Sequence, residues 1–137
     1  MKVTSRAPAR VDLAGGTVDI WPLYLFHPGA QTVNLAIRCY ASCEIETRAD
    51  RRLVFMSEDQ GIRESFGSLA ALSLKASRLP LVCELVRFFQ PERGMTIRTT
   101  SQVPAGAGLG GSSALNIALC GALARATGRR YSREKIL

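Results

Sequence analysis

Residues 36–47, AIRCYASCEIET, alternate strictly between two kinds of side chain. The apolar or small set is Ile37, Cys39, Ala41, Cys43 and Ile45, and the polar set is Arg38, Tyr40, Ser42, Glu44 and Glu46. Because successive side chains of a strand point to opposite faces, this pattern predicts a strand that is buried on one face only. Strands with one solvated face are typical of antiparallel sheets. We therefore expect a sheet with helices on one face.

Other segments supply partners for this strand. Residues 52–58 follow a short turn and are predicted to form a hairpin with 36–47, and residues 94–103 form a further strand with one polar side. Three segments have helical patterns, namely 68–78, 80–90 (Pro80 in the first turn, apolar stripe Leu81, Leu85, Phe88 and Phe89) and 112–128, which ends at Gly128. The sequence therefore predicts an α/β fold of the α+β type with a mixed, largely antiparallel sheet.

The composition fits one soluble domain, with 137 residues, 47% hydrophobic and 21% charged. No apolar run approaches the roughly 20 residues that span a bilayer, so no membrane association is expected. The start, MKVTSRAPARVD, lacks a signal-peptide core, which favours a cytoplasmic location. The four cysteines include no C-x-x-C pair, so we expect reduced, buried thiols rather than a metal site.

The net charge is +7, and part of it gathers between residues 125 and 135. Such a cluster suits an anionic ligand or a nucleic acid. It also suits the end of a helix, where cations complement the helix dipole. We favour the second interpretation for this cluster, because Tyr131 is its one aromatic residue and single-stranded nucleic acids need more surfaces for base stacking.

The segment VPAGAGLGGSSALNIAL (103–119) contains the dinucleotide-binding pattern G-x-G-x-x-G at Gly106, Gly108 and Gly111. That interpretation requires a buried parallel strand before the loop, but the preceding strand has polar side chains on one face. Its second requirement, an acidic residue about 20 positions later, has only Glu134 as a candidate. Walker A is excluded because no Gly-Lys-Ser/Thr occurs. A dinucleotide enzyme is therefore disfavoured.

The same segment still favours phosphate. Glycines let the backbone approach an anion closely, and the start of a helix adds unpaired N–H groups and a positive dipole end. Ser112 and Ser113 stand where this helix is expected to begin. Their side chains can cap the helix, and a serine hydroxyl at such a place can also bind a phosphate-bound Mg²⁺. The alternative is a loop whose small residues serve only close packing.

Two motifs resemble those of the GHMP kinases, the family that includes galactokinase and the homoserine, mevalonate and phosphomevalonate kinases. PAGAGLGGSSA (104–114) is similar to the family's P-x-x-x-G-L-G-S-S-A. APARVDLAGGTVDIWP (7–22) is similar to its first motif, P-G-[RK]-V-x-L-x-G-E-H-x-D. The likeness is nearest to the branch of sugar kinases, including heptose-phosphate and fucose kinases.

The resemblance implies a role for each matching position. The nucleotide phosphates of ATP are assigned to Pro104, Gly106, Gly108, Leu109, Gly110, Gly111, Ser112 and Ser113. Ser112 is the expected Mg²⁺ ligand, with Ser113 as the alternative. Arg10 is assigned a catalytic place beside the transferred phosphoryl group. Asp19, with Gly16 and Thr17, is assigned to the substrate, although Asp19 also suits an Asx-turn.

The resemblance also implies the activity and its partners. The chain, residues 1–137, is expected to be the N-terminal ATP-binding domain of a longer kinase whose C-terminal domain is absent, and to be inactive alone. The complete enzyme is expected to transfer the γ-phosphoryl group of ATP to a sugar or sugar phosphate. A mevalonate-type acceptor, or a non-catalytic nucleic-acid-binding module, is the alternative. A homodimer is left open, and a structural role is expected for Asp12.

Overall fold

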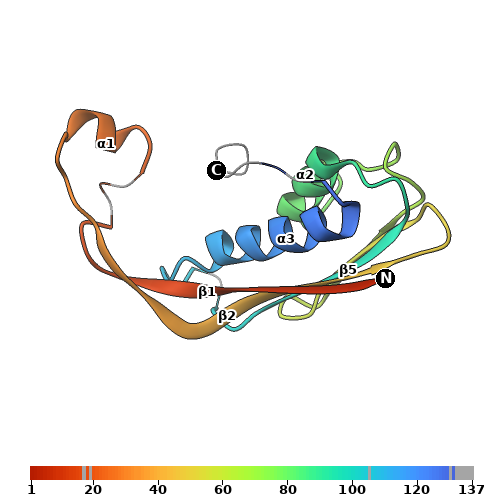
Figure 1. Cartoon of the computed structure of the whole chain (residues 1–137), viewed down its shortest axis with the longest axis horizontal. Helices are drawn as coiled ribbons and strands as arrows, with labels where there is room; N and C mark the ends of the chain where they lie inside the picture. The colour runs from red at the N-terminus through yellow and green to blue at the C-terminus, as the bar shows by residue number, and fades with distance from the viewer. Residues whose placement is uncertain (17, 19, 105, 130, 132–137) are drawn as a thin grey trace.

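The computed structural model describes residues 1–16, 18, 20–104, 106–129 and 131. Its elements are, in chain order, β1 (Lys2–Ala14), α1 (Leu23–Phe26), β2 (Val33–Thr47), β3 (Leu53–Ser57), β4 (Ile62–Phe66), α2 (Pro80–Phe89), β5 (Met95–Ser101) and α3 (Gly111–Thr127). Figure 1 shows two layers, a curved sheet with α2 and α3 on one face. The predicted α+β fold is confirmed.

The five strands lie in the order β1-β2-β5-β3-β4. All neighbours are antiparallel except β3 and β5, which are parallel. The predicted hairpin between 52–58 and 36–47 is therefore wrong. Strand β3 pairs with β4 on one side and with β5 on the other, so β5 enters the sheet between β2 and β3.

Gly94 explains how β5 enters between two strands that follow each other in sequence. Its N–H donates to Asp50 O at 2.9 Å, and its carbonyl accepts from Arg48 N at 2.8 Å. A Cβ at Gly94 would lie 2.5 Å from the carbonyl oxygens of both Asp50 and Arg52. The backbone of β5 thus begins inside the turn between β2 and β3, at a position that only glycine fits.

The alternating strand is confirmed, and its apolar side faces the helices. Ala41, Cys43 and Ile45 are buried, whereas Ile37 and Cys39 are only partly covered because β2 continues there beyond its pairing with β5. The largest fully buried side chains come from every layer of the fold: Phe55, Phe89, Ile45, Leu53, Met95, Ile97, Leu119, Leu123, Val86, Cys43 and Cys83.

Two of the three predicted helices form. The helix predicted for 112–128 is α3, and Gly128 ends it in the left-handed region at φ +70°. The helix predicted for 80–90 is α2, but its buried residues are Val82, Cys83, Val86 and Phe89. The buried face of α2 therefore differs from the predicted apolar stripe, of which only Phe89 is buried.

Residues 68–78 form turns, so the helix predicted there is wrong. The carboxylate of Glu64 accepts hydrogen bonds from Ser77 Oγ and from Arg78 N, both at 2.6 Å. The hydroxyl of Ser77 in turn accepts from Leu79 N at 2.9 Å. Serine hydroxyls compete in this way with helical hydrogen bonds, which the apolar spacing alone does not reveal.

All four cysteines carry free thiols, and the predicted burial is confirmed for three of them. Cys43, Cys83 and Cys120 are buried, and Cys39 is partly exposed. Burial raises the pKa of the Cys43 thiol to about 12, with the charge of Glu44 acting in the same direction. Such a thiol stays protonated at neutral pH and packs as a small apolar side chain.

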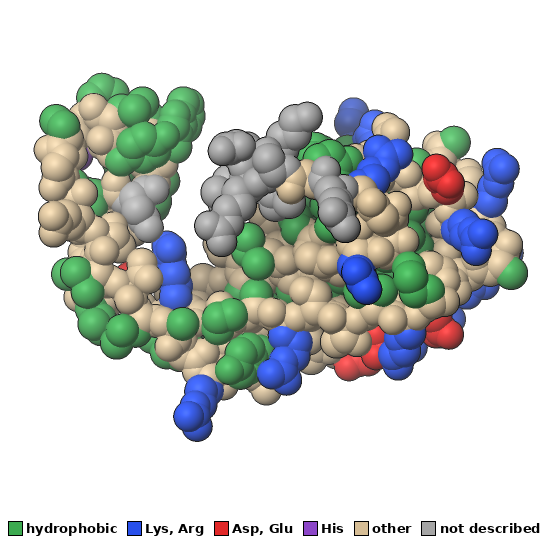
Figure 2. Space-filling model, in the orientation of Figure 1, with side chains coloured by type: hydrophobic (Ala, Val, Ile, Leu, Met, Phe, Trp, Pro, Cys, Tyr) green, Lys and Arg blue, Asp and Glu red, His purple; other side chains and the backbone are tan. Residues whose placement is uncertain are grey.

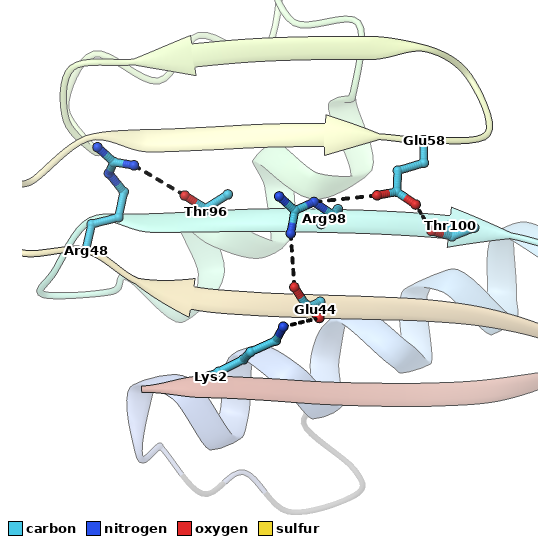
Figure 3. Close-up of polar contacts among 7 residues, drawn as sticks. All are labelled: Lys2, Glu44, Arg48, Glu58, Thr96, Arg98 and Thr100. Carbon is cyan, nitrogen blue, oxygen red and sulfur yellow. Dashed lines mark hydrogen bonds and ion pairs between the residues drawn. The ribbon is translucent and has the colours of Figure 1, made fainter.

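The solvated face of the sheet carries a row of ion pairs that crosses three strands (Figure 3). Glu44 accepts from Lys2 Nζ at 2.9 Å and from Arg98 Nη1 at 3.0 Å, and Arg98 Nε lies 3.5 Å from Glu58. The hydrogen bond from Lys2, with the charges of Lys2 and Arg98, holds the pKa of Glu44 below its ordinary value. These exposed pairs fix which face of the sheet meets water.

Within the described part of the chain, no helix has the length and apolar character needed to cross a lipid bilayer.

The position of Gly94 predicts a stability difference between two glycines. Gly94→Ala is expected to lower the free energy of unfolding by about 1–3 kcal/mol, because the new Cβ meets backbone that cannot move independently. Gly67→Ala is the matched control, since a Cβ there meets nothing within 4 Å, and it is expected to change stability by less than about 0.5 kcal/mol. Urea unfolding of both variants measures this, and equal stabilities would contradict the packing argument.

Candidate functional site

The glycine-rich loop connects β5 to α3. Gly106, Gly108 and Gly110 all have positive φ, at +80°, +69° and +64°. The described residues between them, Ala107 and Leu109, do not. Left-handed residues at every second position turn successive N–H groups toward one side, which creates a concave site for an anion.

The N-terminus of α3 points into this loop. The first hydrogen bond of the helix runs from Ala114 N to Gly110 O at 2.9 Å, so the N–H groups of the three residues before Ala114 have no acceptor inside the helix. Ser112 and Ser113 are exposed members of the first turn. The predicted capping role is wrong, because Gly110 is the N-cap residue and no side chain caps the helix.

Arg10 of β1 lies against the same loop. Its backbone N–H donates to Leu109 O at 3.1 Å, and its Cγ would lie 3.3 Å from a Cβ built at Gly110. Its Nε lies 3.3 Å from Asp12 Oδ1. The two sequence motifs, which are far apart along the chain, therefore meet at Arg10 and Gly110.

A hollow of about 260 Å³ opens beside this junction. Its lining includes all eight residues that the resemblance assigned to the nucleotide: Pro104, Gly106, Gly108, Leu109, Gly110, Gly111, Ser112 and Ser113. The structure thus brings the whole assigned set to one surface.

Asp59 and Gln60 also line the hollow, from the turn between β3 and β4. Ser57 Oγ donates a hydrogen bond of 3.1 Å to Asp59 Oδ1, which orients that carboxylate. Sequence reasoning missed both residues because it paired β3 with β2. With the observed pairing, β3 runs parallel to β5, so their ends lie together and the turn after β3 comes next to the glycine-rich loop.

Beyond Arg10, β1 and β2 continue as a two-stranded arm that carries α1, and we use this name for residues 11–35. Figure 1 shows the arm curving toward the helical side of the sheet. The arm exposes Leu13, Ile20, Trp21, Leu23, Tyr24, Leu25, Phe26, Val33 and Leu35. Figure 2 shows hydrophobic side chains on the surface of this arm.

The base of the arm is closed by Gly15. Thr32 Oγ1 donates to Gly15 O at 3.0 Å, and a Cβ at Gly15 would collide with the carbonyl oxygen of Gln31. Gly16 lies directly on the side chain of Asp12. Thr17 and Asp19, which the resemblance assigned to the substrate, lie outside the described residues.

The basic segment at the end of α3 has ordinary helix-end contacts where it is described. Arg125 is exposed in the last turn. Arg129 Nη2 donates to Gln90 O at 3.5 Å. Both positions agree with the interpretation in which these cations complement the end of a helix.

Comparison with known proteins gives a consistent result. Residues 71–137 match the model of the GHMP kinases N-terminal domain. The mevalonate kinase of Thermococcus gammatolerans is 33% identical over 99% of this chain and 42% of its own length. The D-glycero-alpha-D-manno-heptose 7-phosphate kinase of Campylobacter jejuni is 30% identical over 89% of this chain and 37% of its own length.

A solved structure has a similar fold. The D-glycero-D-manno-heptose 1-phosphate kinase from Bacteriodes thetaiotaomicron superposes with a TM-score of 0.76 and 29% identity, over 90% of this chain and 41% of that one. Both the fold and the sequence motifs are therefore similar to those of the N-terminal domain of GHMP kinases. The chain is thus similar to the GHMP kinases in sequence and in fold, and it spans about 40% of the length of these relatives.

The contact between Gly110 and Arg10 predicts a local effect of a methyl group. Gly110→Ala is expected to lower the free energy of unfolding by about 1–2 kcal/mol, because a left-handed conformation disfavours a Cβ, and also to displace Arg10. Gly128→Ala is the matched control, since Gly128 has a similar φ of +70° and open space around it. Only Gly110→Ala should shift the NMR signal of the Arg10 Nε–H group. An unchanged Arg10 signal would contradict the contact.

Proposed function

We propose that residues 1–137 form an ATP-binding N-terminal domain, and that the complete protein transfers the γ-phosphoryl group of ATP to a small-molecule acceptor. The observation that carries this proposal is the meeting of Arg10 with the glycine-rich loop. A guanidinium beside a concave row of backbone N–H groups and the start of α3 is an arrangement for binding a chain of phosphates.

The size of the hollow agrees with a site that binds the phosphates of ATP rather than the whole nucleotide. Pockets that bury whole small molecules usually measure about 300–1,000 Å³, whereas this hollow measures about 260 Å³. It therefore suits the phosphates, with the nucleoside extending toward Asp59 and Gln60. Asp59 offers a carboxylate and Gln60 an amide, and both suit hydrogen bonds to hydroxyl or amino groups of a nucleoside.

Arg10 has the electrostatic role in the proposed reaction. Phosphoryl transfer depends mainly on positioning and on stabilising the charge that develops on the transferred group. Arg10 lies between the loop and the arm. It is thus in place to contact the group that passes from a donor on the loop side to an acceptor on the arm side.

Magnesium is implied by the family, and the residues present fit it in part. Ser112, the expected ligand, and Ser113, the alternative, line the same hollow as Asp59. Among the described residues no group of three or more His, Cys, Asp or Glu side chains gathers. This fits a Mg²⁺ ion held largely by phosphate oxygens with few protein ligands. Such an ion would neutralise phosphate charge.

We propose a sugar or a sugar phosphate as the acceptor. Asp19 is the one acidic residue between Leu13 and Cys43, and a carboxylate can accept hydrogen bonds from two neighbouring hydroxyl groups. The heptose-phosphate kinase resemblance supports this choice. The mevalonate kinase of similar identity supports the alternative acceptor class.

Binding of ATP tests the donor side. In isothermal titration calorimetry with ATP and Mg²⁺, the purified protein is expected to bind. Gly108→Val combined with Ser112→Ala is expected to weaken binding at least tenfold, or about 1.4 kcal/mol, because a side chain would enter the phosphate site. Gly128→Val shares the left-handed conformation but lies outside the hollow, and it should bind as the parent protein does. Equal affinities in both variants would contradict the phosphate site.

Acceptor choice is tested with the complete enzyme. An ADP-release screen over sugars, sugar phosphates and mevalonate is expected to give turnover with a sugar class. Asp19→Asn should then lower kcat/KM at least tenfold, about 1.4 kcal/mol, while the affinity for ATP is unchanged. Glu92→Gln, an exposed carboxylate elsewhere, is the control. Turnover with mevalonate alone would replace the sugar proposal by the isoprenoid one.

A further inference from the structure

The side chain of Asp12 is held on two sides. Its Oδ1 lies 3.3 Å from Arg10 Nε, and only 27% of the side chain is exposed. On its other side, a Cβ built at Gly16 would lie 2.8 Å from both Cβ and Oδ2 of Asp12. The carboxylate of Asp12 therefore packs against the backbone of Gly16, in space that the side chain of any larger residue would fill.

The strand geometry around the pair is irregular. The pairing of β1 with β2 shifts register between Pro8 and Arg10 and again between Asp12 and Ala14. Such irregularities re-aim side chains and occur often beside functional sites. Here they bracket the two residues that form the ion pair.

Arg10 connects this pair to the glycine-rich loop through Leu109 O and Gly110. An arginine side chain loses rotamer entropy when it is ordered, so an acceptor at Nε lowers the cost of ordering the guanidinium for a ligand. From these contacts we propose that Asp12 is a positioning residue, which holds Arg10 in the orientation that receives the phosphate chain. This inference rests on the proposed ATP site.

A purely electrostatic role for Asp12 has the opposite consequence. A carboxylate close to a polyphosphate repels it, so on charge alone the loss of Asp12 strengthens ATP binding. If Asp12 acts through the orientation of Arg10, its loss weakens ATP binding. The sign of the change in affinity therefore decides between the two roles.

The experiment is calorimetric titration of the purified protein with ATP and Mg²⁺. Asp12→Ala is expected to weaken binding about two- to fivefold, the range for a partly exposed ion pair. Asp12→Asn should restore most of the affinity, because the amide oxygen still accepts from Nε. In an Arg10→Ala background, Asp12→Ala should no longer weaken binding.

Glu44→Ala is the matched control. The side chain of Glu44 is also 27% exposed and also paired with cations, but it lies on the solvated face of the sheet (Figure 3). This variant should bind ATP as the parent protein does. Unfolding temperatures of the same samples, and of Asp12→Glu if the alanine variant does not fold, separate loss of fold from loss of orientation.

A second measurement is independent of nucleotide. The NMR signal of the Arg10 Nε–H group should exchange slowly with solvent in the parent protein and in Asp12→Asn, and faster in Asp12→Ala. Unchanged or tighter ATP binding in Asp12→Ala, or equally weak binding in Asp12→Asn, overturns the positioning role while the ATP site stands. A parent protein that binds no ATP overturns the proposed function, and the inference falls with it.

Discussion

The close approach of Gly94 to the turn between β2 and β3 is the constraint on which the arrangement of the site depends. A hydrogen bond from Gly94 N to Asp50 O and one from Arg48 N to Gly94 O fix the start of β5 inside that turn. Strand β5 then runs between β2 and β3. At its C-terminal end β5 leads into the glycine-rich loop, which lies beside the turn that carries Asp59. A β5 strand at the edge of the sheet would leave the loop with a different set of neighbours.

The sequence predicts well those features that are local. The alternation of β2, the end of α3 at Gly128 and the special backbone of the glycine-rich loop all follow from side-chain period or from glycine's tolerance of positive φ. The pairing of β3 is not local, because two-residue periodicity defines the faces of a strand but not its neighbours. The short strand β4 was not predicted, because the sequence analysis assigned its partner β3 to β2 instead.

Residues of the candidate site divide along the same line. Arg10 and the loop residues were found through motifs, although only the folded chain shows that Arg10 touches Leu109 and Gly110. Asp59 has no sequence signal that connects it to a loop more than forty positions away, and it enters through the pairing of β3 with β5. For Ser112 and Ser113 the motif gave the right position but the wrong capping role. Gly110 ends the loop in a left-handed turn, so the serines fall inside the helix and leave the cap to the backbone.

The junction at Arg10 also relates the two sides of the proposed reaction. Contacts continue from Gly110 to Arg10, from Arg10 to Asp12, and from Asp12 to Gly16 within the arm. Each contact is short, and two of them involve a glycine whose missing side chain allows the approach. A shift of the loop on binding phosphate would therefore be felt first at Arg10 and next at the base of the arm. Because packed contacts of this kind tolerate little displacement, the proposed donor site and the proposed acceptor side are connected through the contacts of Arg10 and Asp12.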